Sequence, residues 1–270
     1  MSMRIVVCAK EVLDPDAVNN YALEGRLEIG ADGRTLTQTS IPRVMNAYDE
    51  QGIEAALRLR EAGLGCTLTV VSVGLSDGSE ILKHAAALGA DEIVSIPIDP
   101  TTLDHHGVAR LLAAYVRSSG DAGLVLCGRQ ASDDDQGVVP ALMSELLGMP
   151  VVTVARSLEM IGDTDVRVVR VTPDGDETVE VSCPAIVTIS NELGQPRYPT
   201  MAGRMAARKK RATEVQPETL GVGDLSPHVV LTRQLVPAVK GACEIIAGGS
   251  AAEAAERLVA RLRADGVLRA

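Results

Sequence analysis

The first 150 residues alternate short apolar runs with segments whose apolar residues recur at helical spacing, and this alternation constrains the fold most. The runs at 4–9, 66–73, 92–98 and 124–127 lack the every-second-residue pattern of a half-exposed strand. Between and after them, the spacing predicts helices around 46–58, 81–88, 108–116 and 138–147. Strands buried on both faces and separated by amphipathic helices indicate an α/β fold with a parallel sheet and helices on both faces.

The pattern changes beyond residue 150. Strands are predicted at 153–160, 166–172, 178–183 and 185–189, with a hairpin turn at 173–176, and a small early hairpin is expected at 27–38. A basic run follows at 204–211, and Ser250 with Glu253 forms a capping box for a last helix. The interval 212–249 lacks the pattern of a core. We expect either an extended arm that packs on another chain or a partly ordered extension, and therefore divide the chain into 1–211 and 212–270.

The loop after the fourth apolar run is the most informative stretch. A strand ends at Cys127, Gly128 allows a sharp turn, and polar residues lead into a helix with Pro140 near its first turn. A strand, a glycine turn and a helix N-terminus together present free N–H groups to an anion. The acidic triplet Asp133–Asp135 complicates this reading, because three carboxylates repel a phosphate unless they cap the helix or contact the ligand in another way. Both readings of the triplet stay open.

Two other segments also combine a strand end or a helix start with residues typical of turns and caps. Residues 73–79 turn sharply after the second apolar run, and Asn46–Asp49 opens a helix that Asn46 can cap. Because the carboxyl ends of parallel strands meet at one edge of the sheet, we expect a nucleotide-binding crevice there.

Composition excludes several classes of protein. A formal net charge of −10 argues against nucleic-acid binding, and the absence of Trp and Phe disfavours a surface that stacks bases. The five cysteines are odd in number and widely spaced, which indicates reduced thiols in a cytoplasmic protein. The histidines and cysteines lack metal-ligand spacing, and no apolar run is long enough to insert into a membrane.

Known catalytic motifs are also missing. The chain has no GxGxxG after its first strand, no GxxxxGK[ST] and no GxSxG. Lys10 and Glu11 could be imagined as an acid–base pair, although charges at strand ends are usually solvated. A nucleotide crevice without a catalytic set favours nucleotide binding or electron transfer over bond chemistry, so we do not expect an enzyme. A stand-alone nucleotide-binding homo-oligomer is the alternative.

The sequence resembles the beta subunit of electron-transfer flavoproteins over roughly residues 1–215. Five stretches carry the resemblance: Arg4–Lys10 with Asp14, Met45–Glu50 leading into Glu54–Glu61, Ala86–Asp91, Gly128–Asp135 as the G[KR]QAxDxD loop, and Pro196–Tyr198 as the PRY element. The resemblance implies a Rossmann-like, adenine-nucleotide-binding core. It also implies a heterodimer with a larger alpha subunit that holds most of the FAD. Electrons would pass from flavin dehydrogenases, such as acyl-CoA dehydrogenases, to a quinone oxidoreductase or another acceptor.

The resemblance also implies site residues. AMP would contact the residues matching the family's motifs: Cys8, Asn46, Ala47, Tyr48, Asp49, Val73, Gly128, Arg129, Gln130, Ala131, Ser132, Asp133, Asp134, Asp135, Gln136, Gly137, Val138 and Val139. A docking loop near 191–205 would contact the dehydrogenase through Tyr198, Met201, Arg204 and Met205. Met201 stands where the family usually has Leu, and methionine suits adaptable contacts.

Three departures from the family pattern bear on the ligand. Gln136–Val139 replaces a CNQT run and removes side-chain donors, Pro15 stands where a flavin-facing Tyr is common, and Ala206 replaces a Lys. Some branches of the family hold a second FAD in place of AMP and bifurcate electrons. The altered run keeps both nucleotides open as ligands of this chain.

Overall fold

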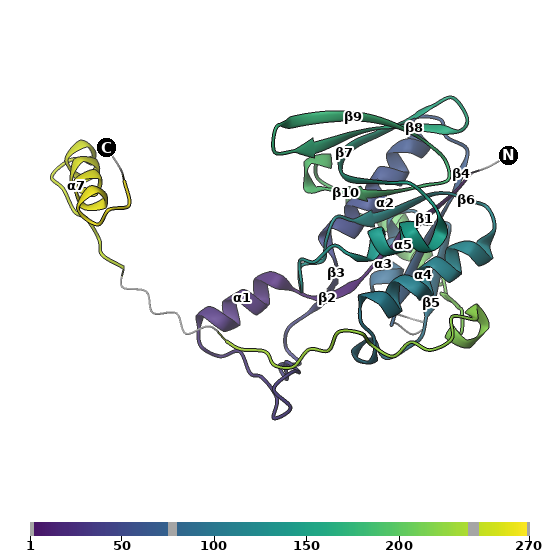
Figure 1. Cartoon of the computed structure of the whole chain (residues 1–270), viewed down its shortest axis with the longest axis horizontal. Helices are drawn as coiled ribbons and strands as arrows, with labels where there is room; N and C mark the ends of the chain where they lie inside the picture. Colours follow the sequence, from purple (N-terminus) through teal and green to yellow (C-terminus); the bar gives the residue numbers. More distant parts are fainter. Residues whose placement is uncertain (1–2, 75–79, 237–242, 269–270) are drawn as a thin grey trace. The chain divides into compact units, whose positions relative to one another are not determined.

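The computed structural model describes residues 3–74, 80–236 and 243–268 (Figure 1). The chain forms two compact units, Met1–Gln234 and Leu235–Ala270. Within the described ranges, no helix is both long and apolar enough to cross a membrane.

A sheet of nine strands forms the centre of the first unit. Its order is β11 (Thr213–Glu214), β5 (Glu92–Ile96), β4 (Cys66–Val73), β1 (Met3–Cys8), β6 (Ala122–Gly128), β10 (Ala185–Ile189), β7 (Val151–Ile161), β8 (Asp165–Thr172) and β9 (Gly175–Ser182). The seven strands from β11 to β7 are parallel, whereas β8 and β9 extend the sheet as an antiparallel pair joined at the predicted turn. The predicted mainly parallel sheet is thus confirmed.

Helices cover both faces of the parallel part (Figure 1). Helices α2 (Ala47–Glu61) and α3 (Glu80–Leu88) pack on one face, and α4 (His105–Ser119) and α5 (Val139–Leu147) pack on the other. Within β1, Ile5 and Val7 join the first core cluster while Val6 and Cys8 join the second. Both faces of the strand are therefore buried, which explains why its apolar run does not alternate.

Several elements carried too little periodicity to be predicted. Helix α1 (Pro15–Leu23) is held at its start by Asp14, whose carboxylate accepts a bond of 3.0 Å from the Asp16 amide. The short strands β2 (Glu11–Leu13) and β3 (Arg43–Met45) form a separate antiparallel pair. The early hairpin is reduced to one bridge between Ile29 and Leu36.

Strand β5 ends at Ile96, before the predicted 98, because its neighbour β4 ends at the residue paired with Ile96.

The segment after β10 returns along the body. It contains the 3₁₀ helix η2 (Asn191–Leu193), helix α6 (Met201–Ala207), strand β11 and the 3₁₀ helix η3 (Pro217–Leu220), and η1 (Pro100–Thr102) precedes α4. Residues 212–234 belong to the first unit. In the second unit, α7 (Ala251–Ala264) begins at Ser250, whose hydroxyl accepts a bond of 3.2 Å from the Glu253 amide as predicted. No side chain of α7 is fully buried.

Candidate functional site

A cavity lies at the carboxyl ends of β1 and β6. The chain adds β4 and β5 on one side of β1 and then returns to place β6 on the other side, so the strand order reverses between β1 and β6. Ligands of open α/β sheets bind at such a reversal. The cavity is open to solvent and is lined by Cys8, Lys10, Asn46, Asp49, His105, Cys127, Gly128, Gln130, Ala131, Asp134, Gly137, Val138, Val139 and Pro140.

The first turn of α2 clamps the two loops that border the cavity. The Asp49 carboxylate accepts bonds of 2.8 Å from the Lys10 amide and 2.8 Å from the Gly128 amide, joining the ends of β1 and β6. The Asn46 side chain donates to the Gln130 carbonyl at 2.9 Å and accepts from the Ser132 amide at 3.3 Å. Asn46 precedes α2 as expected, but its side chain does not cap the helix, because both ends of its amide are engaged by the loop.

Asp49 is a buried carboxylate that forms no direct ion pair with any other described residue. Burial raises the pKa of Asp49 to about 6, although the hydrogen bonds from the Lys10 and Gly128 amides oppose this rise. The floor beside it is formed by Cys8 and Cys127, which are in-register neighbours on β1 and β6 and free thiols. The hydrogen bond with Cys8 and burial raise the pKa of the Cys127 thiol, so this thiol supplies neutral, soft surface.

The acidic triplet does not cap α5. Asp133 forms an ion pair of 2.7 Å with Lys10, and Asp134 contacts His105 at 2.9 Å. Asp135 has a positive φ of 54° and accepts a bond of 2.7 Å from Gln130. The three carboxylates are therefore engaged with the cavity rim, and much of their charge is balanced by Lys10 and, when it is protonated, by His105.

The start of α5 closes the far side of the cavity. Val138 precedes the helix and gives it no side-chain cap, so the first amides of α5 are left to solvent or to a ligand. Gly137 has φ +62°, and a Cβ there would collide with the Arg129 carbonyl. Glycine therefore lets the loop fold back against itself and turn into α5.

Most residues suggested by the resemblance lie at this cavity or beside it. Those lining it are Cys8, Asn46, Asp49, Gly128, Gln130, Ala131, Asp134, Gly137, Val138 and Val139. Seven others lie in the segments 46–49 and 128–139 without lining the cavity, namely Ala47, Tyr48, Arg129, Ser132, Asp133, Asp135 and Gln136. The remaining residue, Val73, ends β4. The Tyr48 ring lies 5.4 Å from the Arg129 guanidinium. Of the turn predicted at 73–79, residues 75–79 lie outside the described residues.

Four lining residues were not among the contacts expected from the resemblance. They are Lys10, His105, Cys127 and Pro140. Lys10 and Glu11 do not form the imagined acid–base pair, since Glu11 contacts Arg43 at 3.2 Å and Lys10 contacts Asp133. The available signal was positional, because His105 opens the helix that follows the third apolar run and so lies at the carboxyl edge of the sheet.

The lining residues fit an adenine nucleotide. A nucleotide needs close backbone approach and N–H donors for phosphate, with apolar surface for the base. Gly128 lets the loop pack closely on α2, Gly137 lets it fold back on itself, and both residues line the cavity. The start of α5 offers amides, and Cys127, Val138 and Val139 offer apolar surface. Among the described residues, no group of three or more His, Cys, Asp or Glu side chains is placed to hold a metal ion.

A second candidate surface lies on and before α6. Tyr198 is 84% exposed and Met201 is 74% exposed, and Met205 is exposed one helical turn further on. The Thr200 hydroxyl caps α6 by accepting a bond of 3.0 Å from the Gly203 amide. Gly203 lies so close to α3 that a Cβ would collide with the Ala87 carbonyl. The exposed apolar side chains therefore stand on a helix that is tightly packed from beneath, and Arg204 lies among them.

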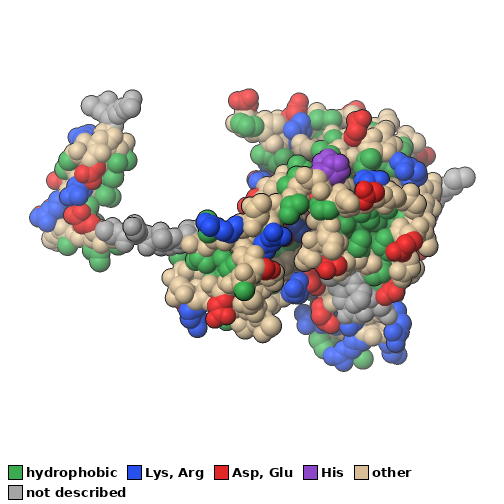
Figure 2. Space-filling model, turned by 60° about the horizontal axis from the view of Figure 1, so that its bottom comes forward, with side chains coloured by type: hydrophobic (Ala, Val, Ile, Leu, Met, Phe, Trp, Pro, Cys, Tyr) green, Lys and Arg blue, Asp and Glu red, His purple; other side chains and the backbone are tan. Residues whose placement is uncertain are grey.

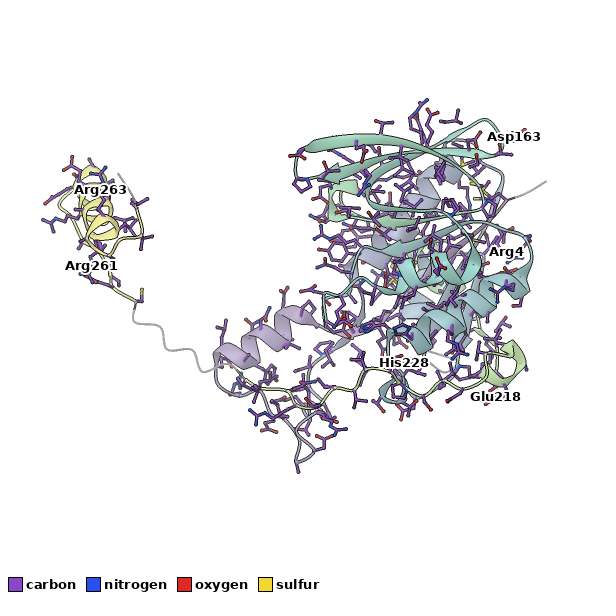
Figure 3. All side chains as sticks on the ribbon, in the orientation of Figure 1. Arg4, Asp163, Glu218, His228, Arg261 and Arg263 are labelled. Carbon is purple, nitrogen blue, oxygen red and sulfur yellow. The ribbon has the colours of Figure 1, made fainter. Side chains whose placement is uncertain are left out.

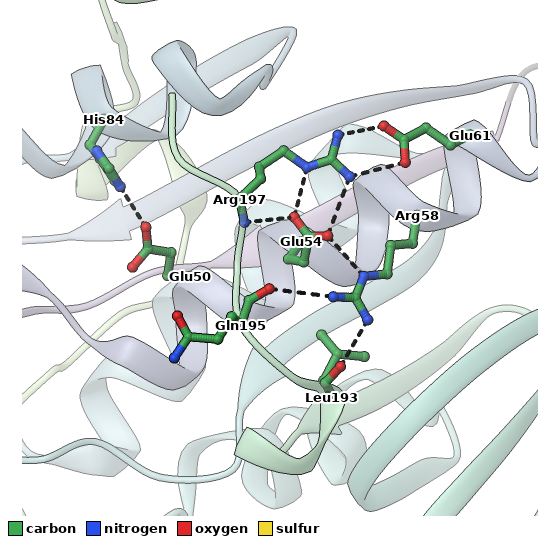
Figure 4. A network of polar contacts seen from close by, with 8 residues as sticks. All are labelled: Glu50, Glu54, Arg58, Glu61, His84, Leu193, Gln195 and Arg197. Atoms are coloured by element: carbon green, nitrogen blue, oxygen red, sulfur yellow. Dashed lines mark hydrogen bonds and ion pairs between the residues drawn. The ribbon is translucent and has the colours of Figure 1, made fainter. Parts of the chain in front are cut away.

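An ion-pair network fixes the segment that leads into α6 (Figure 4). Arg197 donates to Glu54 at 2.7 Å and to Glu61, and the Glu54 side chain is only 6% exposed. Arg58 binds Glu54 at 2.8 Å and donates to the Leu193 carbonyl at 2.8 Å. Helix α2 thus clamps the loop at the cavity through its first turn and holds the α6 segment through its later turns.

Figure 2 shows the face of the first unit that lies at the bottom of Figure 1. The surface of this face is hollowed near its middle, and both basic (Lys, Arg) and acidic (Asp, Glu) side chains lie at the rim of the hollow.

Comparisons with known proteins agree on one family. The family described as "Electron transfer flavoprotein domain" matches residues 34–220. Subunit CarD of the caffeyl-CoA reductase-Etf complex of Acetobacterium woodii is 32% identical over 268 residues, which cover 97% of this chain and 98% of that protein. The electron transfer flavoprotein subunit beta of Bradyrhizobium diazoefficiens is 32% identical, covering 87% of this chain and 90% of its own. That of Homo sapiens is 31% identical, with 98% of both chains covered.

Proposed function

Because the chain belongs to the electron transfer flavoprotein family as a beta subunit, we propose that it pairs with an alpha subunit and carries electrons through a shared FAD. Beta subunits of this family are electron carriers and do not catalyse bond chemistry themselves. The electrons would come from flavin dehydrogenases of the acyl-CoA dehydrogenase type and pass to a quinone oxidoreductase or another acceptor in the cytoplasm. When bound, FAD supplies the redox chemistry.

The cavity at the strand reversal is the observation that carries the proposal. The Asn46 and Asp49 side chains hold the loop 127–135 against the end of β1, and this gives the nucleotide a preformed cradle. AMP would be held by the amides at the start of α5 and by the loop 128–135. Lys10 and His105 would lie near its charged groups. In this role the nucleotide is structural, and the chain's residues bind and orient it.

The α6 segment would contact the dehydrogenase. Exposed apolar side chains on a well-anchored helix suit a transient protein interface, and Met201 can adapt its shape to a partner. The residues proposed to make this contact are Tyr198, Met201, Arg204 and Met205. The Arg197 network would keep the segment in place between encounters.

Residues 212–270 would form the arm and helix that pack on the alpha subunit. Helix α7 has no fully buried side chain, and Leu258 and Val259 on it are exposed. An amphipathic helix with an uncovered apolar stripe gains stability by packing on another protein surface. Within this proposal, that surface belongs to the alpha subunit.

Co-purification with a candidate alpha subunit tests the function. We expect a yellow heterodimer that releases one FAD and one AMP on acid treatment, measured by absorption and by chromatography of the released nucleotides. A colourless homo-oligomer that binds no alpha subunit would instead support a stand-alone nucleotide-binding protein and would overturn the proposal.

A second FAD in place of AMP is the other candidate, in an electron-bifurcating version of the complex. The run Gln136–Val139 favours it. Its residues Gly137, Val138 and Val139 line the cavity and carry no side-chain hydrogen-bond donor, and Gln136 is the one donor in the run. The similarity to a subunit whose name places it in a caffeyl-CoA reductase complex supports a dedicated partner enzyme. Release of two FAD and no AMP per heterodimer would select this version.

A further inference from the structure

The chain from Val222 to Gln234, here called the strap, contacts α4 with its first half and ends before the second unit begins at Leu235. Arg110 on α4 donates to the carbonyls of Val222 and Asp224. The side chains of Val222 and Leu225 pack against the core cluster beneath α4. The first half of the strap is therefore bound to the body by backbone contacts and by burial.

Asp104, the residue before α4, makes the central contact with the strap. One carboxylate oxygen accepts a bond of 2.9 Å from the Gly107 amide and caps α4. The other accepts bonds of 2.6 Å from the His228 amide and 3.0 Å from the Val229 amide. Burial raises the pKa of Asp104, but the three amides outweigh it and hold the pKa at about 2. The carboxylate thus stays ionised, which strengthens all three bonds.

Two further contacts fix the strap on either side of Asp104. The His106 and His228 rings stack with their centroids 4.9 Å apart, and His228 lies beside the first turn of α4 (Figure 3). Towards its end, the strap donates from the Gln234 amide to the Gly33 carbonyl at 2.8 Å. The backbone between these points is held at both ends.

The side chains between the two fixed points face solvent. Val229, Val230 and Leu231 are consecutive, and each is more than half exposed, at 64%, 57% and 52%. Three adjacent large apolar side chains on a tethered backbone form a patch of the kind that marks a protein-binding surface. The strap leads directly into the second unit, whose helix α7 is proposed to pack on the alpha subunit, so the patch is continuous in the chain with that proposed contact.

We propose that Asp104 seats the strap on α4 and thereby holds Val229, Val230 and Leu231 in position to contact the alpha subunit. The inference rests on the proposed function for the identity of the partner, whereas the seating itself concerns this chain alone. Asp104 is a positioning residue, since it acts through the strap backbone. A segment ordered before binding loses less conformational freedom on association, so the seating favours assembly.

Asp104→Ser separates the two roles of the carboxylate. Serine is a good helix cap and can keep the bond to the Gly107 amide, but it has no second oxygen for the strap. Asp104→Asn is a second variant that preserves volume if the serine variant folds poorly. Asp99→Asn is the matched control, because Asp99 caps the nearby η1 through the Thr101 amide and makes no contact with the strap among the described residues.

Hydrogen exchange of the full-length chain tests the seating. In Asp104→Ser the amides of His228 and Val229 should exchange at least about tenfold faster, while the Gly107 amide stays protected and Asp99→Asn matches wild type. Unchanged exchange at both strap amides in Asp104→Ser and Asp104→Asn would overturn the inference.

Affinity for the alpha subunit tests the consequence. The Asp104→Ser chain should bind it about tenfold more weakly. Leu231→Ser leaves the Asp104 contacts in place. It should therefore weaken binding of the alpha subunit while the amides of His228 and Val229 exchange hydrogen as in wild type. Unchanged affinity in both variants would overturn the role of the strap in assembly. If wild type binds no alpha subunit, the proposed function fails, while the exchange result still decides the seating.

Discussion

Replacing Gly128 by Ala should damage the candidate nucleotide site by forcing the first turn of α2 away from the loop. A Cβ on Gly128 would lie 2.5 Å from the Asp49 carboxylate, 2.7 Å from the Tyr48 Cβ and 3.1 Å from the Asn46 amide nitrogen. Real Cβ atoms essentially never approach a neighbour closer than 3.0 Å. Tyr48 is touched at the atom next to its backbone, so it cannot swing aside, and the first turn of α2 must move.

The cost follows from what that movement breaks. Overpacking a buried site by a methyl group costs about 1–3 kcal/mol. A shift of Asp49 also weakens its bond to the Gly128 amide, and a buried amide left without an acceptor costs about 1–3 kcal/mol. Allowing for partial relaxation, we expect the free energy of unfolding to fall by about 2–4 kcal/mol. For a unit of this size, that lowers the thermal midpoint by about 5–15 °C.

Thermal unfolding with and without AMP measures both effects. Gly65→Ala is the matched control, because a Cβ at Gly65 meets no atom of the described residues within 4 Å and its φ is not positive. The control should melt and bind like wild type, whereas Gly128→Ala should melt lower and bind AMP at least about tenfold more weakly, since the loop 128–132 loses its clamp. If Gly128→Ala melts with the control and binds AMP normally, the clamp does not shape the cavity.

Three further predictions concern the two candidate surfaces. Met201→Ala should raise the KM of the partner dehydrogenase for this protein, because an exposed apolar contact is lost, and it should leave flavin content unchanged; loss of flavin would mean that the α6 segment contacts the flavin-bearing side instead. Among the described residues, Arg197→Met leaves Glu54 paired with Arg58 alone, so it should lower the free energy of unfolding by about 2–3 kcal/mol in urea titrations. Arg197→Lys should cost less, and equal costs would argue against the two-point contact. Asp49 binds its proton more tightly in the folded chain, where its pKa is about 6, than in the unfolded chain, where its pKa is about 3.8. The tighter proton binding therefore stabilises the folded chain fully below pH 3.8, and this contribution is lost as the pH rises through 6. The stability of wild type relative to Asp49→Asn should therefore fall by about 2 kcal/mol between pH 4 and pH 7, and a difference independent of pH would show that Asp49 titrates normally.

Strands and helices were predictable from the sequence where the burial of their side chains follows a regular pattern. The run around Ile5–Cys8 reads as a strand covered on both faces because each of its side chains enters one of the two core clusters. Helix α1 was missed because it has only nine residues, a short apolar stripe and no buried side chain. Helix α7 also buries no side chain, but its longer apolar pattern and its capping box made it predictable.

Asn46 shows where local reasoning stops. The sequence marks it as a cap of α2, and it does stand at that position, but its side chain bonds to Gln130 and Ser132 instead. The loop offers one carbonyl and one amide in the geometry that an asparagine side chain matches. A local rule cannot weigh that competition, because the competing partners are more than 80 residues away in the chain.

The sequence by itself determined the parallel sheet, the turns at the ends of its strands and the edge at which the cavity forms, because these depend on apolar periodicity and on glycine and helix-start signals within short windows. Only the tertiary structure decided how the side chains there are paired. Lys10 meets Asp133 across 123 residues of chain, and Asp104 meets the strap across 124. Such contacts depend on distances that exist only after the strands are ordered in the sheet.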